Sequence, residues 1–244
     1  MVSSPRGRSR HLEKLIFLTW KRADLDVDAC REALLGPLAE RVLAMPGVRA
    51  LKVSVADLAG REIPKPPLLM GEGKTFSASV DVWLDCLDDR GPILDALGEH
   101  ASRCDAYLVT ESVPQACADR DWPDGEKSPG VTHFTWFPKP ARLSDEAFFR
   151  AWHEVHTPFS FELHPLRWEY VRNAVARTLT PGSPPVRAIV GERFRTLEDY
   201  SDPRRLYGSK EALARVMDDT VQFGDVEDMH SAPLSEYILR SLSR

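Results

Sequence analysis

Apolar positions in the first hundred residues predict strands and helices in alternation. Residues 15–20 form a short apolar and aromatic run, and residues 50–55 alternate polar and apolar side chains, so both segments are expected to be strands. Between them, residues 29–43 repeat leucine and valine at helical spacing, which is typical of a helix that covers a sheet. A further strand, helix and strand are expected at residues 76–84, 92–103 and 106–113.

The same pattern occurs a second time in the chain. The segment FLTW at 17–20 matches HFTW at 133–136, and Pro37 matches Pro158. Each half therefore reads strand, helix, strand, strand, helix, strand, which is the order of a ferredoxin-like unit. The expected boundaries are a flexible tail at 1–11, a first repeat at 12–114, a linker at 115–130 and a second repeat at 131–240.

Two ferredoxin-like units in one chain supply eight strands. Each sheet hides one face under its helices, so its other face is expected to meet the sheet of the other half and close a barrel. The expected fold is α+β, with two fused repeats that form an eight-stranded dimeric α/β-barrel-like pseudo-dimer. Such a barrel is either filled by side chains or holds one small ligand, so its interior is the expected site. The irregular stretch 57–74 is either a lid over the barrel mouth or a segment packed onto a helix.

Composition and charge narrow the class of protein. With 43% hydrophobic and 28% charged residues the chain is globular in make-up, and its longest apolar run, at 15–18, is far shorter than the roughly 20 residues of a membrane span. A net charge of -5 argues against nucleic acid as a partner. The apolar stretch of a secretory signal is missing and the cysteines are irregularly spaced, so a cytoplasmic protein with reduced thiols is expected.

Common cofactor and nucleophile motifs are missing from the sequence. It has no GxGxxG or GxxxxGK[ST] loop for a nucleotide, no GxSxG turn for a nucleophilic serine, and no cysteine–histidine signature of a thiol hydrolase. His153 and His156 are three residues apart, whereas the HExxH motif spaces its ligands by four, and no third ligand is near. We therefore expect neither a metal site nor a cofactor.

Residues 148–173, FFRAWHEVHTPFSFELHPLRWEYVRN, combine an aromatic-rich helix carrying His-x-Pro, a turn with proline, and a strand with a tyrosine and an asparagine. This stretch resembles the signature of the EthD family within the dimeric α/β barrel superfamily. The first half resembles it less closely, because Leu35 stands where the histidine belongs. The matching positions are His156, Pro158, Pro165, Tyr170 and Asn173.

The resemblance implies a tandem barrel in which one chain supplies both halves that relatives build as homodimers. Because fusion already closes the barrel, we expect a monomer or a weak homodimer. The resemblance also implies chemistry on small, often aromatic or polyketide-like molecules, since the superfamily is similar to cofactor-free isomerases, cyclases, dehydratases and monooxygenases. Some neighbouring families bind haem, which leaves haem as an alternative cofactor.

His156 is the first candidate catalytic residue. The two halves of a fused pseudo-dimer begin equivalent, so a titratable group in one half, opposite Leu35 in the other, marks a broken symmetry. An unperturbed imidazole, with a pKa of about 6.5, accepts and donates protons at neutral pH, as dehydration, enolisation or cyclisation requires. The alternative is a partly buried histidine bonded to a backbone carbonyl near the break that Pro158 imposes on the helix.

Strand alternation decides where His133, a second candidate catalytic residue, points. We prefer the arrangement with Trp136 beneath the helices and His133 facing the barrel interior. With the faces reversed, His133 is a core histidine and Trp136 lines the interior. The match of Trp136 with Trp20 indicates a shared packing role for the two tryptophans. His164 and His230 stand in turn-like sequence and are expected to be solvated.

The remaining candidates surround the His-x-Pro segment. Tyr170 is a candidate proton donor, and Asn173, which strand parity places on the opposite face, is a candidate for orienting the substrate. Arg172 shares the face of Tyr170 and favours an anionic or enolate-bearing ligand if that face is interior. Trp152 and His153 are assigned to substrate binding, with His153 at the rim and its ring flanking Trp152.

Taken together, the residues predict a cofactor-independent enzyme that acts on a small organic molecule in the barrel pocket. His156 is the acid or base, assisted by Tyr170 and His133, and the reaction is of lyase, isomerase or cyclase type. The alternatives are a haem-binding or cofactor-free monooxygenase barrel, a non-catalytic small-molecule carrier, and a barrel filled by its own side chains.

Overall fold

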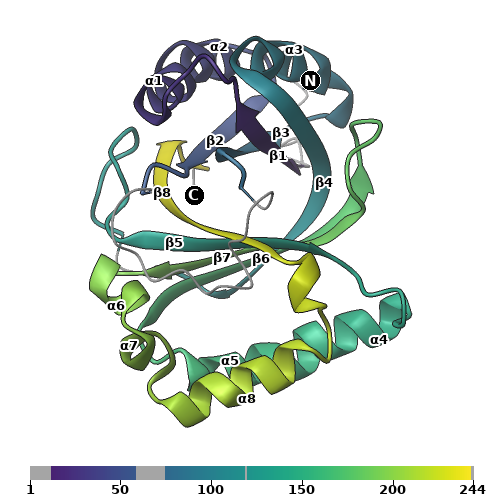
Figure 1. Ribbon diagram of the computed structural model, residues 1–244. Coiled ribbons are helices and arrows are strands. Elements are labelled where there is room, and N and C mark those ends of the chain that lie inside the picture. The colour runs from purple at the N-terminus through teal and green to yellow at the C-terminus, as the bar shows by residue number, and fades with distance from the viewer. Residues whose placement is uncertain (1–11, 59–74, 119, 243–244) are drawn as a thin grey trace, which may run out of the picture.

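The strands close into one antiparallel barrel. The computed structural model describes residues 12–58, 75–118 and 120–242, so the expected tail at 1–11 and most of the expected lid at 57–74 lie outside the described residues. The strands are β1 Glu13–Lys21, β2 Val48–Val55, β3 Ala78–Leu84, β4 Ala101–Gln115, β5 Val131–Pro138, β6 Arg167–Thr178, β7 Val186–Phe194 and β8 His230–Arg240. Around the barrel their order is β1-β3-β2-β8-β5-β7-β6-β4 (Figure 1).

Each half of the barrel has the strand order of a ferredoxin-like sheet. The first half runs β4-β1-β3-β2 and the second half runs β8-β5-β7-β6. Two pairings, β2 with β8 and β4 with β6, join the halves at both edges. No sheet edge is left over in this closed order, which satisfies the backbone groups that an open edge would expose. The expected α+β fold with two fused repeats is confirmed.

Helices cover the outer face of the first-half sheet. The first covering helix begins at Asp26, whose carboxylate accepts a hydrogen bond from the Ala29 N–H and so caps it. Beneath the helices lies an apolar core that includes Phe17, Val53 and Val80, each fully buried. The helical segments are α1 Val27–Ala33, π-helix η1 Leu34–Leu38, α2 Ala39–Leu43, 3-10 helix η2 Leu87–Arg90 and α3 Gly91–His100.

Helices also cover the second-half sheet, on the opposite side of the barrel (Figure 1). The one helix expected before the last strand is divided into three, each begun by a capping side chain at Thr196, Asp202 or Ser209. The segments are α4 Asp145–Phe149, π-helix η3 Arg150–His156, α5 Thr157–Leu163, α6 Leu197–Ser201, α7 Pro203–Tyr207, α8 Lys210–Thr220 and 3-10 helix η4 Val226–Asp228. None of the helices in the described ranges is long and apolar enough to cross a membrane.

The His-x-Pro helix does not break at its proline. Thr157 donates its backbone N–H to the carbonyl of Trp152, five residues back, so the turn before Pro158 widens into a π-helix. A widened turn accommodates a proline, which lacks an N–H and crowds the preceding carbonyls. The first half has a π-helix at the matching place, around Pro37. The expected break at Pro158 is therefore wrong, and the helix continues with His156 at the end of the widened turn.

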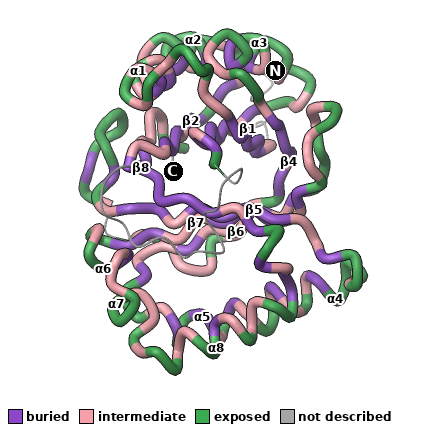
Figure 2. Tube along the Cα trace, in the orientation of Figure 1, coloured by how far each residue is buried: buried purple, intermediate pink, exposed green. Residues whose placement is uncertain are grey.

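Side chains fill one end of the barrel interior. Aromatic and aliphatic groups from both halves meet there, and His230 stacks on Trp136 with ring centroids 3.8 Å apart. Trp20 contacts Trp136 edge to face, so the packing role expected for the two tryptophans is confirmed. Figure 2 shows the strands as mostly buried and the outer sides of the helices as exposed.

Ion pairs fill the other end of the interior. Lys14 lies 3.1 Å from Asp81 and 2.6 Å from Glu111, while Lys52 joins Asp81 to Glu236. The void among these groups measures about 10 Å³, which is about the space of one water molecule. Among the described residues, the chain's own side chains therefore occupy much of the interior, and the expected ligand site inside the barrel stays a prediction.

Candidate functional site

A cavity of about 110 Å³ lies between the outer face of the second-half sheet and the helices that cover it. Its floor is the helix-facing surface of β5, β6 and β7, with the side chains His133, Thr135, Phe137, Tyr170, Val190, Glu192 and Phe194. Its roof and ends come from the helices and loops, with Trp152, His156, His164, Leu206, Tyr207, Val216, Met217, Thr220, Phe223, Val226 and Met229. The site is therefore built within one half of the chain.

Three chemically active side chains form a row across the floor. Glu192 on β7 is paired with His133 on β5 and with Tyr170 on β6, so the three lie side by side on one face. This face turns toward the helices, and Trp136 on the opposite face of β5 turns into the barrel. The preferred orientation of β5 is thus wrong, and the reversed one, with His133 outside the barrel, is correct.

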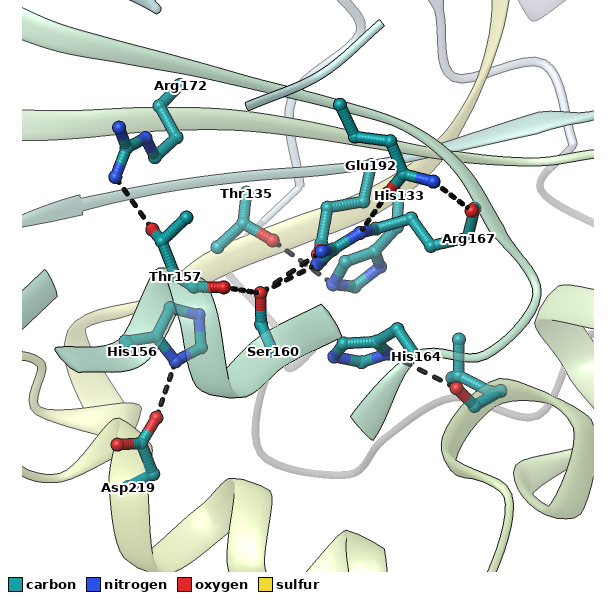
Figure 3. A network of polar contacts seen from close by, with 12 residues as sticks. His133, Thr135, His156, Thr157, Ser160, His164, Arg167, Arg172, Glu192 and Asp219 are labelled. Atoms are coloured by element: carbon teal, nitrogen blue, oxygen red, sulfur yellow. Dashed lines mark hydrogen bonds and ion pairs between the residues drawn. The ribbon is translucent and has the colours of Figure 1, made fainter. Parts of the chain in front are cut away.

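His156 and Asp219 form a pair in the roof. His156 ends η3, and its Nδ1 lies 2.5 Å from Oδ2 of Asp219 in the last turn of α8 (Figure 3). The two side chains are 12% and 11% exposed, so water screens their contact only weakly. Since Asp219 holds Nδ1 and the ring lines the cavity, Nε2 is the nitrogen that can act on a ligand.

Arg167 holds Glu192 from behind. The fully buried guanidinium donates to Oε1 of Glu192 at 2.6 Å, to the Ser160 hydroxyl, and to the Gln115 side chain (Figure 3). Burial alone would raise the pKa of the Glu192 carboxyl, but the charges of the surrounding basic groups, Arg167 among them, outweigh it and hold the pKa well below its usual range. Glu192 is therefore ionised at neutral pH and fixed in position.

The His133 ring lies within a chain of hydroxyl groups. Its Nδ1 lies 3.1 Å from the Tyr200 hydroxyl and its Nε2 lies 3.2 Å from the Thr135 hydroxyl, which in turn contacts Ser231 at 2.6 Å. Burial lowers the pKa of His133, with nearby Glu192 opposing the shift. The ring is therefore uncharged at neutral pH, and both of its nitrogens already have partners.

His164 lies at one end of the cavity, so the expectation that it is solvated is wrong. Its Nδ1 donates to the carbonyl of Leu206 at 3.2 Å, which fixes the tautomer with the proton on Nδ1. Its ring packs beside Tyr207, with centroids 5.3 Å apart. Burial lowers the pKa of His164, so this imidazole is also uncharged at neutral pH. His230, expected to be solvated as well, stacks inside the barrel.

Tyr170 is the buried hydroxyl of the floor. Its side chain is 1% exposed, and the Arg167 guanidinium lies over its ring at 4.2 Å. Burial raises the pKa of Tyr170 to about 12. The phenol therefore keeps its proton at neutral pH and is a hydrogen-bond donor rather than a base.

The other predicted residues divide between the cavity and its supports. Trp152 lines the cavity, and the ring of His153 flanks Trp152 as expected, at 4.5 Å between centroids, but does not line the cavity. Arg172 shares the face of Tyr170 and donates to the Thr157 hydroxyl at 2.7 Å, which ties β6 to the helix instead of facing a ligand. Asn173 points into the barrel and donates to the carbonyl of Ile189.

The first half provides an internal comparison for the site. In the sequence repeat, Phe17 stands in the place of His133 and Leu35 in the place of His156. In the strand registers, Val80 stands in the place of Glu192 and Val53 in the place of Tyr170. All four are apolar and belong to or pack against the first-half core. The fold therefore does not need polar groups at these positions, and their presence in one half only points to function.

Sequence reasoning missed Glu192, Asp219 and Arg167. Comparing β3 with β7 in register would have found Glu192, since a buried carboxylate replaces Val80 there. Asp219 belongs to α8, one of three helices in the second half that take the place of the single α3 of the first half, so the repeat gives no residue-by-residue match for it. Among the described residues, no group of three histidine, cysteine, aspartate or glutamate side chains could hold a metal ion.

Known proteins resemble this chain in fold. No protein-family profile and no curated protein matches the sequence. Among solved structures, an anthrone oxidase-like protein has a TM-score of 0.57 at 13% identity, covering 97% of this chain and 96% of its own. Candidate monooxygenases from Fusobacterium nucleatum subsp. nucleatum and Lactobacillus acidophilus NCFM score 0.53 and 0.50, at 10% and 9% identity, covering 94% of this chain and 93% and 97% of their own. These similarities establish the dimeric α/β barrel fold.

Proposed function

We propose that this protein is an enzyme that moves protons on a small organic molecule bound between the second-half sheet and its helices. The observation that carries this proposal is the pair of His156 and Asp219 at 2.5 Å in the wall of a cavity lined mainly by aromatic and aliphatic groups. A carboxylate on one imidazole nitrogen orients the ring and stabilises the imidazolium that forms when the other nitrogen takes a proton.

The reaction begins with the transfer of a carbon-bound proton. His156 takes the proton from a carbon next to a carbonyl, the C–H electron pair forms a new C=C bond, and the carbonyl π pair moves onto the oxygen to give an enolate. The neutral Tyr170 hydroxyl donates a hydrogen bond to developing negative charge, while Asp219 stabilises the imidazolium. Returning the proton to another carbon gives an isomer, and expelling hydroxide, which takes up that proton, gives a dehydrated product and water.

The cavity walls supply binding and exclusion of water. Phe137 packs against Trp152 and Phe223, each at 6.0 Å between ring centroids, so flat aromatic surfaces line the space beside His156. Such walls hold an apolar ring and strengthen the electrostatic interactions inside the site. This arrangement supports the substrate class implied by the resemblance of residues 148–173 to EthD proteins.

Haem does not fit this site. The cavity measures about 110 Å³, less than the roughly 150 Å³ that holds a single benzene ring, and a porphyrin has four pyrrole rings. The protein's own acid and base groups therefore carry the proposed chemistry.

Oxygenation is a second candidate outcome of the same first step, supported by the structural similarity to an anthrone oxidase-like protein and to candidate monooxygenases. The enolate carbon would attack dissolved dioxygen, and collapse of the resulting hydroperoxide would convert a CH₂ group to a carbonyl with release of water. This course consumes one O₂ per turnover, so an oxygen electrode distinguishes it from isomerisation or dehydration. Both courses require the proton transfer at His156.

The proposal is tested by hydrogen–deuterium exchange into small enolisable ring ketones in D₂O, followed by proton NMR. The wild-type protein is expected to accelerate exchange at carbons next to the oxygen-bearing carbon, and His156→Gln to reduce the acceleration by roughly 10²- to 10⁴-fold. Glu154→Gln is the control, since Glu154 is exposed on the same π-helix and outside the cavity lining. Exchange that survives His156→Gln, or probes that bind without any exchange, would contradict the proposal.

A further inference from the structure

We infer that the cavity selects an uncharged or cationic single-ring molecule that carries a hydrogen-bond donor, and rejects anions, with Glu192 as the residue that determines this specificity. The inference rests on the proposed function in one respect, because it names the substrate class of the same site. It makes predictions about binding alone, which are measured without turnover.

The first step is the charge of the lining. Glu192 is the one side chain among the described lining residues that carries a full charge whatever the state of the histidines, and no lysine or arginine lines the cavity. Arg167 neutralises Glu192 from behind, but its guanidinium is fully buried and already bonded to Ser160, Gln115 and Oε1 of Glu192. A ligand therefore meets the carboxylate and not the cation.

The second step concerns the histidines, which would be the other source of positive charge. Both nitrogens of His133 have hydroxyl partners, and the Nδ1–H of His164 is given to the Leu206 carbonyl. Burial lowers the pKa of both rings and keeps them uncharged at neutral pH. Arg172, which the sequence offers as a partner for an anion, is bonded to Thr157 outside the cavity lining. The remaining histidine of the lining is His156, and the Asp219 carboxylate balances any positive charge on its ring. A carboxylate ligand would therefore lose its hydration without gaining an unbalanced cationic partner.

The third step is the polarity along the cavity. His133, Glu192 and Tyr170 make one end of the floor polar, while Phe137 and Val190 continue the same face as an apolar surface. A ligand with a hydroxyl or amino group satisfies the carboxylate at the polar end. Its ring then extends along the apolar floor, so the donor group and His156 act on different parts of one molecule.

The fourth step is size. The volume of about 110 Å³ approaches the roughly 150 Å³ that accommodates benzene. Met217 and Thr220 on α8 line the cavity and are partly exposed, so the space opens to solvent on that side and a substituent can extend outward. Since the enclosed volume is smaller than that of a benzene cavity, a single ring occupies the site with its donor group at Glu192 and its far edge in this opening.

The test is calorimetric binding of three probes of similar shape and different charge: benzyl alcohol, benzylamine and benzoate. The wild-type protein is expected to bind benzyl alcohol and benzylamine and to bind benzoate at least tenfold more weakly at pH 7. In Glu192→Gln the preference for benzylamine over benzoate should fall at least fivefold. Glu154→Gln removes the same charge from the exposed side of η3 and should keep the wild-type ranking.

Benzoate binding as tight as benzyl alcohol, or no binding of any probe up to its solubility limit, would overturn the inference. The wild-type ranking alone is decisive if Glu192→Gln does not fold. If the protein binds benzyl alcohol and benzylamine more tightly than benzoate but catalyses no hydrogen–deuterium exchange, the proposed function is contradicted and the inferred selectivity stands. If the protein catalyses hydrogen–deuterium exchange but does not discriminate against benzoate, the inferred selectivity is contradicted and the proposed function stands.

Discussion

His156 and Asp219 are 63 positions apart in sequence and meet only because α8 crosses over the His-x-Pro helix. The carboxylate fixes the imidazole so that Nε2 serves the cavity, an arrangement that a lone histidine on a helix surface lacks. The sequence identified His156 because Leu35 occupies the matching place in the first half. The sequence did not predict a role for Asp219, since an aspartate in an amphipathic helix is ordinarily a solvated residue.

The contact between His156 and Asp219 predicts that substitutions of Asp219 and of its neighbour Asp218 differ in their effect on the reaction rate. Asp219→Asn should lower exchange or turnover on the order of 10²-fold, because the amide neither orients the ring in the same way nor stabilises the imidazolium. Asp218→Asn, which removes an exposed carboxylate one residue earlier on α8, should leave the rate within about twofold. Equal rates in the two variants, measured by the same NMR exchange experiment, would remove Asp219 from the mechanism.

Arg167 connects one strand of the first half to two elements of the second half. It binds Gln115 on β4, Ser160 on α5 and Glu192 on β7, so one side chain fixes both the floor and the roof of the site. At this scale the sequence predicted most strands and the first covering helix, because alternation and capping residues are local signals. It did not predict the π-helix before Pro158 or the division of the last helical segment, because both depend on contacts made across the folded chain.

The buried ion pair between Arg167 and Glu192 predicts how the free energy of unfolding changes when one or both partners are replaced. Arg167→Met should destabilise the protein by about 3–5 kcal/mol, because Glu192 is left as a buried charge without its partner. Arg167→Met combined with Glu192→Leu should be more stable than the single variant by at least about 1 kcal/mol, as the apolar Val80 at the matching first-half position indicates. Urea unfolding measures both, and a double variant no more stable than the single one would contradict this role.

The whole molecule is a barrel whose two halves differ in what lies between the sheet and its helices. The first half packs an apolar core where the second half builds the cavity, and ion pairs between charged side chains of both halves occupy the interior they share. The repeat in the sequence was sufficient to predict the closed barrel. It did not place the site, because both a packed and a ligand-holding interior satisfy the same pattern of alternation, and only side-chain volumes decide between them.

Buried charges predict that the molecule loses stability in acid. Burial and Arg172 lower the pKa of His153 to about 4, so the unfolded chain takes up this proton first, below about pH 6.5. Lys52 and Lys14 outweigh burial and hold the pKa of Asp81 below its usual range, and that of Glu192 is lowered as well. Carboxyl groups with lowered pKa values stabilise the fold above their unfolded pKa of about 4, and this stabilisation is lost below it.

The urea midpoint should therefore be highest near neutral pH, decline below about pH 6.5 and fall more steeply below about pH 4. Circular dichroism at a series of pH values measures this profile. A midpoint that stays constant from pH 7 to pH 3 would contradict the roles assigned to these buried groups.

Methionine methyl NMR tests most directly the claim that the ligand site lies between the second-half sheet and its helices. Of the 5 methionines, Met217 and Met229 line the cavity, whereas Met45 packs against the first-half core. Titration of ¹³C-methyl-methionine protein with benzyl alcohol should shift the signals of Met217 and Met229 saturably and leave that of Met45 unmoved. Binding that leaves Met217 and Met229 unshifted would place the site elsewhere and contradict the account.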